Sequence, residues 1–236
     1  MPQLPRALLV DLDDTILAYS AAGTVMWRTV CEEFAAELDG VDATTLLATV
    51  EAVARWFWSD SQRHRRGRHD LFAARRTIVR TAFDRLGRAE RDTADRLADA
   101  FTVRREEALA PFPGAVETLG ELRRQGVGLA LITNGSALFQ RRKIERFNLE
   151  PLFDALCIEG ELGFGKPDRR VFDTALARLG TAPGAAWCIG DNLDWDIAPA
   201  LALGMTAIWV DHAMQGLPAD TTVRPSRTIP ALAELL

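Results

Sequence analysis

The sequence predicts an α/β fold, in which a doubly wound parallel sheet is interrupted by an all-helical insertion. Short apolar runs alternate with stretches of helical periodicity, a pattern typical of a parallel sheet with helices on both faces. The apolar runs span 7–11, 127–133, 155–160, 186–191 and 206–211. The helical stretches between them span about 114–125, 137–147, 168–179 and 194–203.

The segment 19–108 interrupts this alternation. Its pattern is helical throughout, without a convincing strand run. The motif "PFPG" at 111–114 is a poor helix interior and marks the return to the sheet. We therefore expect two domains: a core made of 1–18 and 109–236, and a helical insertion at 19–108. The tail "RTIPALAELL" is predicted to form one short closing helix.

Composition limits the classes of protein to which the chain can belong. With 236 residues, of which 48% are hydrophobic and 26% charged, the chain is typical of a globular protein. Its net charge of −5 argues against a general nucleic-acid binder. The longest apolar runs fall far short of the roughly 20 residues that span a bilayer. The N-terminal residues show no secretory signal, and we expect a cytoplasmic protein that binds neither membranes nor nucleic acid.

Acidic residues follow the first apolar run directly. Asp11, Asp13 and Asp14 come after "ALLV", and side chains at i and i+2 of an extended backbone point to the same side. The Asp11 and Asp13 carboxylates would then lie within a few ångströms of each other. Both can ionise only with a cation between them, or else one keeps its proton. The alternative is that the acidic residues merely cap a turn.

The second apolar run ends in "ITNGS", between a predicted strand and a predicted helix. Backbone N–H groups of 133–136, in front of a helix N-terminus, would form an anion site. Under the alternative interpretation, Ser136 or Asn134 is an ordinary helix N-cap.

A lysine follows the third apolar run, in the motif "FGKPD". Lys166 and Lys143 are the only lysines among 28 basic residues, which leaves 26 arginines. A lysine in an arginine-rich chain indicates that a compact point charge is required at this loop. The alternatives are a solvated surface lysine and a codon bias that disfavours lysine throughout.

The fourth apolar run ends in "GDNLDWD", with Asp191 at the predicted strand end and Asp196 five residues later. An isolated Asp191 could cap a helix. Together with Asp11 and Asp13 it forms a set of oxygen ligands that suits Mg²⁺. The carboxyl ends of parallel strands lie at one sheet edge, where ligands bind. Carboxylates, a lysine, an anion site and a metal ion at that edge indicate phosphoryl transfer.

These motifs resemble those of the haloacid dehalogenase-like hydrolase superfamily. "DLDDT" is similar to its first motif, "ITNGS" to its second, "GKPD" to its third and "GDNLDWD" to its fourth, in the family's order. The insertion resembles the family's C1-type helical cap. The resemblance covers the whole chain and implies a Rossmann-like core.

The resemblance also implies a role for each residue. Asp11 would be the nucleophile that forms an aspartyl-phosphate, and Asp13 the general acid and base. The Thr133 hydroxyl, the Asn134 backbone amide and Lys166 would bind the phosphoryl group. The ligands of Mg²⁺ would be Asp11, the Asp13 backbone carbonyl and Asp191, with Asp196 in the outer shell.

Several reactions fit the resemblance. Dehalogenases of the family lack the second aspartate, so Asp13 disfavours dehalogenation. Phosphonate-cleaving members need a cap lysine, and 19–108 contains none. The sequence therefore favours an Mg²⁺-dependent phosphatase acting on a small phosphate monoester. A phosphomutase of the same superfamily is the alternative, and a non-enzymatic receiver-like domain is a further one.

The insertion should set the substrate. Residues 54–76 combine aromatic residues with a run of arginines, Arg63, Arg65, Arg66 and Arg68. Some of these could bind an acidic or second phosphate group of the substrate. The alternative is that the aromatic residues form core and the arginines a solvated face. The sequence leaves open whether the protein is a monomer or a homodimer.

Overall fold

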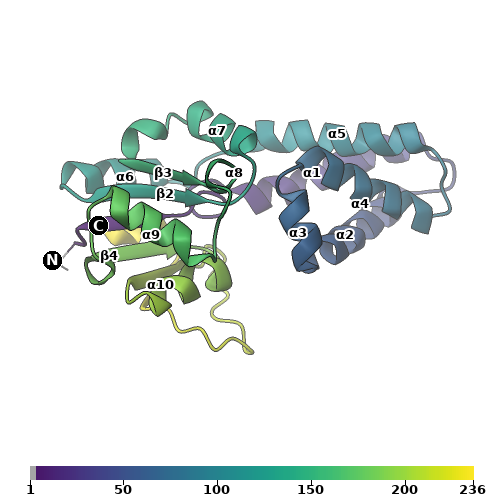
Figure 1. Ribbon diagram of the computed structural model, residues 1–236. Helices are drawn as coiled ribbons and strands as arrows, with labels where there is room; N and C mark the ends of the chain where they lie inside the picture. The colour runs from purple at the N-terminus through teal and green to yellow at the C-terminus, as the bar shows by residue number, and fades with distance from the viewer. Residues whose placement is uncertain (1–3) are drawn as a thin grey trace. The chain divides into compact units, whose positions relative to one another are not determined.

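The computed structural model describes residues 4–236 and divides them into two units. The sheet unit consists of the chain up to Ala18 and of Ala110–Leu236. The helical unit is Tyr19–Leu109. The helical unit is thus a single insertion between the first strand and the rest of the sheet unit (Figure 1).

The sheet unit contains one parallel sheet, whose strands within residues 4–236 follow the order β3-β2-β1-β4-β5-β6. The strands are β1 (Ala7–Val10), β2 (Gly128–Thr133), β3 (Ala155–Ile158), β4 (Ala186–Gly190), β5 (Thr206–Val210) and β6 (Arg227–Ile229). The predicted apolar runs form the first five of these strands. The α/β fold class predicted from the sequence is confirmed.

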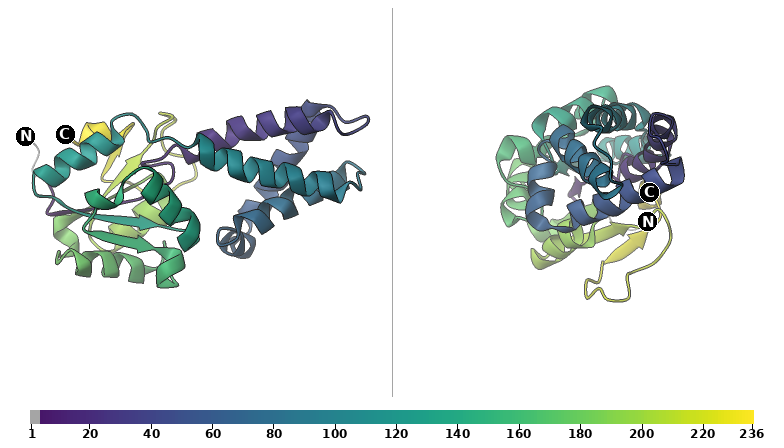
Figure 2. Two further views of the ribbon diagram at one scale, coloured as in Figure 1. Left: turned by 90° about the horizontal axis from the view of Figure 1, so that it is seen from above. Right: turned by 90° about the vertical axis from the view of Figure 1, so that its right-hand side faces the viewer.

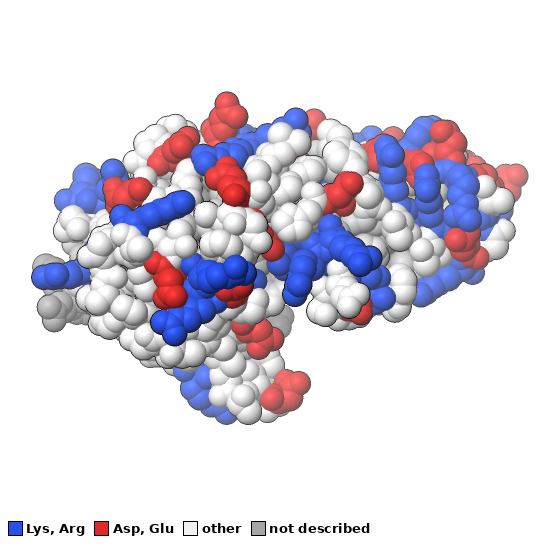
Figure 3. Space-filling view, viewed as in Figure 1, with Lys and Arg blue, Asp and Glu red and all other residues white. Residues whose placement is uncertain are grey.

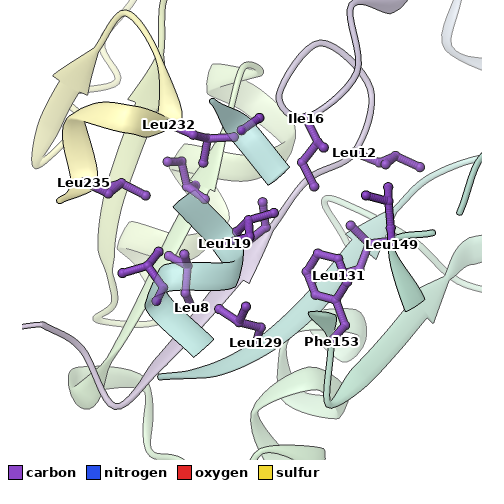
Figure 4. Close-up of a cluster of buried hydrophobic side chains, with 14 of the residues drawn as sticks. Leu8, Leu12, Ile16, Leu119, Leu129, Leu131, Leu149, Phe153, Leu232 and Leu235 are labelled. Carbon is purple, nitrogen blue, oxygen red and sulfur yellow. The ribbon is translucent and has the colours of Figure 1, made fainter. Parts of the chain in front are cut away.

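The side chains of β1 alternate between the two faces of the sheet. Leu8 and Val10 belong to one hydrophobic cluster and Ala7 and Leu9 to the other. Figure 4 shows the first cluster, in which Leu8 and the β2 leucines meet Leu119. Burial on both faces explains why the strands read as continuous apolar runs.

The other strands, the loops and the helices supply the remaining side chains of both clusters. The helices are α6 (Ala115–Arg124), α7 (Ala137–Arg146), α8 (Glu159–Leu162), α9 (Arg169–Arg178) and α10 (Ala198–Ala202). Shorter helical turns are η1 (Glu150–Leu152), η2 (Pro183–Ala185), the π-helical η3 (Leu193–Ile197) and η4 (Leu232–Leu235). The Asp168 side chain caps α9 by accepting from Arg170 N, as expected for an acidic residue at this position.

The C-terminal tail differs from the prediction. Arg227–Ile229 forms strand β6, which pairs with β5, and only Leu232–Leu235 is helical. Two of the three strand residues are exposed, so the segment lacks the apolar run by which the other strands were found. Its extended conformation depends on pairing with β5.

The helical unit is built from amphipathic helices, as the insertion pattern predicts. They are α1 (Tyr19–Ala35), α2 (Ala43–Ser59), α3 (Ser61–Gly67), α4 (Leu71–Arg85) and α5 (Arg91–Ala108). Helix α3 was not expected, and Asp60 caps it by accepting from Gln62 N and Arg63 N. Helix α5 packs against both α1 and α4 (Figure 2). Across residues 4–236, no helix has the length and apolar composition needed to cross a bilayer.

Partly exposed ion pairs connect helix α4 to helix α5. Arg76 binds Asp99 and Arg80 binds Asp95, each with two hydrogen bonds. Figure 3 shows basic and acidic side chains interleaved on the visible face of this unit. Of the arginines in 63–68, Arg63 donates to the backbone carbonyls of Trp56 and Phe57. That guanidinium therefore closes the end of α2.

Candidate active site

Four polar segments meet at the carboxyl edge of the sheet. Strand β1 lies between β2 and β4, with Val10 opposite Leu131 and Ile189. The chain moves from β1 to β2 and β3 on one side, then returns to β4 on the other. This reversal is the topological switch point, where parallel α/β sheets bind ligands.

Asp11, the residue after β1, is buried and held by two donors. Its side chain is only 8% exposed. Lys166 Nζ, itself 4% exposed, pairs with Asp11 Oδ1, and the Thr15 hydroxyl donates to Oδ2 at 3.1 Å. Both carboxylate oxygens thus have a fixed orientation. The sequence predicted Asp11 and Lys166 in one site but did not predict Thr15.

Asp196 shares the ammonium group of Lys166. Its Oδ1 lies 2.6 Å from Lys166 Nζ, and its Oδ2 accepts from Asn192 N at 3.1 Å. Gly190 permits this position, because a Cβ on residue 190 would lie 2.3 Å from the Asp196 carboxyl carbon. Both oxygens of Asp196 are therefore already bound by protein donors.

Asp11, Asp191 and Asp196 form a carboxylate cluster. One oxygen of each lies within 4.8 Å of the others, which is close enough for all three to surround a cation. The Asp191 backbone carbonyl accepts from Trp209 Nε1 at 2.7 Å, which fixes the loop after β4. Hard oxygen donors of this kind suit Mg²⁺ rather than a soft metal.

The cluster strongly perturbs the ionisation of its members. Burial raises the pKa of Asp11 to about 7, and the charge of Asp196 adds to this while Lys166 opposes it. Burial and the charges of Asp11 and Asp196 raise the pKa of Asp191 to about 9. Burial alone would lower the pKa of Lys166, but Asp11 and Asp196 outweigh it and raise the pKa. A bound divalent cation would relieve the repulsion among the carboxylates.

The loop after β2 contacts the Lys166 loop through a side chain. Asn134 Nδ2 donates to the Lys166 carbonyl at 2.7 Å, and Lys166 N donates to Asn134 Oδ1 at 2.8 Å. This reciprocal pair holds the two loops together. The Asn134 side chain therefore positions Lys166 and does not cap helix α7.

The predicted anion site at 133–136 is partly engaged by the protein itself. The Gly135 N–H donates to the Glu159 carboxylate at 2.9 Å. Ser136 is the N-cap of α7, with its side chain accepting from Phe139 N. The helix-cap alternative is thus correct for Ser136. Thr133, the last residue of β2, is buried and its hydroxyl accepts from the Gln140 side chain.

Asp13 faces a different lysine from Asp11. Strand β1 ends at Val10, so the extended alternation does not continue to Asp13. Lys143 Nζ lies 2.8 Å from both Asp13 oxygens, and Gln140 Nε2 donates to Oδ2 at 3.0 Å. Sequence reasoning assigned no role to Lys143 or Gln140. The available signal was their spacing of three residues on a predicted helix, together with the scarcity of lysine.

Comparison with known proteins places these observations in a family. The model of the haloacid dehalogenase-like hydrolases matches residues 5–204. A phosphoserine phosphatase from Thermus thermophilus is 34% identical over 252 residues, covering 98% of this chain and 97% of that protein. The HAD hydrolase YfnB from Bacillus subtilis has a similar fold, with a TM-score of 0.74 and 23% identity, covering 99% and 97% of the two chains.

A 2-haloacid dehalogenase from Pseudomonas syringae is also similar in structure. It has a TM-score of 0.62 and 28% identity over 98% of this chain and 96% of that one. The family model, the near full-length relative and the parallel sheet agree with the four motifs at the strand ends. The chain belongs to the haloacid dehalogenase-like hydrolase family.

Proposed function

We propose that the protein is an Mg²⁺-dependent phosphatase that hydrolyses a small phosphate monoester through an aspartyl-phosphate on Asp11. The observation that carries this proposal is the buried pair of Asp11 and Lys166 at the switch point of the sheet. A carboxylate fixed beside an ammonium group and a carboxylate cluster can attack phosphorus while positive charge stabilises the phosphoryl oxygens.

The residues of this chain divide the reaction into two displacements. In the first, an oxygen of Asp11 attacks phosphorus and the bond to the leaving alcohol breaks. Asp13 gives that alcohol its proton and becomes a carboxylate. In the second, Asp13 takes a proton from water as the water attacks the phosphorus of the aspartyl-phosphate. The bond to Asp11 then breaks, which releases inorganic phosphate and restores both aspartates.

Three further residues would bind the phosphoryl group. Thr133 and the backbone amide of Asn134 would donate hydrogen bonds, and Lys166 would supply positive charge. Asp11, the backbone carbonyl of Asp13 and Asp191 would hold Mg²⁺, which would neutralise charge on the phosphoryl oxygens. Asp196 suits an outer-shell role, because its two oxygens already accept from Lys166 and Asn192.

Asp13 separates this proposal from dehalogenation. Halide is a stable leaving group and requires no proton, whereas an alkoxide does. A carboxylate two residues after the nucleophile therefore favours ester cleavage. The relative from Thermus thermophilus makes O-phosphoserine a reasonable first candidate among small phosphate monoesters.

The experiment is a phosphate-release assay with a panel of monoesters that includes O-phosphoserine and p-nitrophenyl phosphate. We expect turnover by the native protein with Mg²⁺ and none after chelation. The Asp11→Asn variant should lose turnover while remaining folded, with a cooperative thermal unfolding transition. Turnover by Asp11→Asn at the native rate would contradict the proposal, as would a native protein that cleaves no monoester.

A further inference from the structure

Helix α7 brings two polar side chains to the Asp13 carboxylate. Gln140 and Lys143 are three residues apart, so they lie on one face of the helix. Lys143 Nζ contacts both carboxylate oxygens, and Gln140 Nε2 contacts one of them. These contacts fix both the position and the plane of the carboxylate.

Gln140 and Lys143 are more deeply buried than the Asp13 carboxylate that they contact. Gln140 is 2% exposed and Lys143 is 3% exposed, whereas the Asp13 side chain is 24% exposed. The carboxylate is thus anchored by buried donors and remains partly accessible. This arrangement suits a group that exchanges protons with a bound molecule or with water.

The Gln140 amide also connects Asp13 to the end of β2. Its Nε2 lies within hydrogen-bonding distance of Thr133 Oγ1, the Asn134 carbonyl and Asp13, and these three acceptors share its two hydrogens. A carbonyl and a carboxylate only accept hydrogen bonds, so they fix the orientation of the amide. The Thr133 hydroxyl accepts from this amide, and its own proton is then available for another acceptor.

The residue type at position 143 is informative. Lys143 and Lys166 are the only lysines beside 26 arginines (28 − 2), and both are buried against an aspartate of the first motif. An ammonium is a compact point charge, whereas guanidinium is a planar fork with a longer reach. Two aspartates of the first motif, Asp11 and Asp13, are therefore each in contact with a buried ammonium group.

We propose that Lys143 and Gln140 are positioning residues for Asp13, which makes helix α7 part of the acid–base machinery. The inference rests on the proposed function, in which Asp13 transfers protons. Lys143 acts through Asp13 and does not bind the phosphoryl group. Its loss should therefore lower kcat and leave KM nearly unchanged.

Lys143→Met should lower kcat/KM for phenyl phosphate by about 10- to 100-fold, a part of the usual acid–base contribution. The loss for p-nitrophenyl phosphate should be smaller, because its leaving group is less basic and needs less protonation. Lys143→Gln, which keeps a donor but removes the charge, should show the same pattern. Arg142→Met removes the same charge from an exposed position on the same helix and should keep the native rate.

The decisive test is a double-mutant cycle with Asp13→Asn, measured with Mg²⁺ on both aryl phosphates. If Lys143 acts through Asp13, the effect of Lys143→Met disappears in the Asp13→Asn background. Equal fold-losses in the two backgrounds would overturn the inference, and so would a loss that does not depend on the leaving group. If the native protein hydrolyses the aryl phosphates, the proposed function stands whichever way the cycle comes out. A native protein without activity would overturn that function and the inference together.

Discussion

At the scale of single residues, two buried ammonium groups hold three aspartates of the site. Lys166 is shared by Asp11 and Asp196, and Lys143 holds Asp13. Removing one partner of a buried ion pair leaves an uncompensated charge, which is costlier than the net gain from forming the pair. We therefore expect the loss of either lysine to lower stability and, under the proposed function, to lower turnover as well.

Replacing Lys166 with Met should affect both properties. We expect a loss of about 3 kcal/mol in the free energy of unfolding, typical of a broken buried pair. Turnover should fall by about 100-fold or more, because the phosphoryl group loses a charged partner. Urea unfolding and phosphate release measure the two effects. Arg169→Met, on an exposed residue of the same segment, serves as the control, and equal behaviour of the two variants would contradict the assignment.

Strand ends could be recognised from the sequence, whereas helix faces could not. Asp11, Thr133 and Asp191 each lie at the end of an apolar run, so the parallel sheet alone brings them together. Gln140 and Lys143 reach Asp13 from the interior of a helix. The spacing of these two residues indicates that they share a helix face, but which face meets the loop after β1 depends on packing.

At the scale of elements, the start of α7, the helix that carries Gln140 and Lys143, packs closely against α8. Gly160 N donates to the Gly135 carbonyl at 3.0 Å. A Cβ on residue 160 would lie 2.3 Å from Ala137 N, at the start of α7. The backbone of this turn therefore approaches α7 as closely as glycine alone permits.

Gly160→Ala should displace the start of α7 and lower both stability and turnover. Overpacking of this kind typically costs about 1–3 kcal/mol. Gly184→Ala is a matched control, since no atom lies within 4 Å of a Cβ there. Thermal unfolding and phosphate release should show a loss for the first variant only. If Gly160→Ala kept the native unfolding temperature and turnover, the close contact between residue 160 and α7 would not matter for the site.

Strand β6 shows where element prediction failed. The buried strands were found because each is a run of apolar residues between turn residues. Residues 227–229 have no such run, and their extended form comes from pairing with β5. Helix α3 was missed for a similar reason, because its seven residues are mostly polar and its start depends on the Asp60 cap.

At the scale of the whole molecule, the carboxylate cluster links stability to pH. Burial and neighbouring charge raise the pKa of Asp191 from 3.8 to about 9 and that of Asp11 to about 7. Between the ordinary aspartate pKa of 3.8 and these raised values, the two carboxyl groups keep protons in the folded protein that they have lost in the unfolded chain. The contribution of these two groups to stability without metal is therefore greatest at or below the ordinary aspartate pKa, and it falls as the pH rises toward about 9.

Thermal unfolding in a chelator should accordingly show a lower unfolding temperature at pH about 9 than at pH about 5. Asp191→Asn should reduce this decrease, because the variant has no charge to bury. Asp194→Asn, at an exposed position in the same segment, should unfold like the native protein. Mg²⁺ should raise the unfolding temperature most at the alkaline end, where the ligands are ionised. If the unfolding temperature of Asp191→Asn fell between these pH values as much as that of the native protein, the raised pKa of Asp191 would be contradicted.

The central claim is that Asp11 carries the phosphoryl group, and chemical trapping tests it most directly. The native protein is mixed with Mg²⁺ and p-nitrophenyl phosphate, quenched during turnover and treated with borohydride, which reduces an acyl phosphate to an alcohol. Mass spectrometry of the peptide that contains Asp11 should then show homoserine at position 11, and only when substrate was present. Turnover with position 11 unmodified, or with the modification at another carboxylate, would contradict the account.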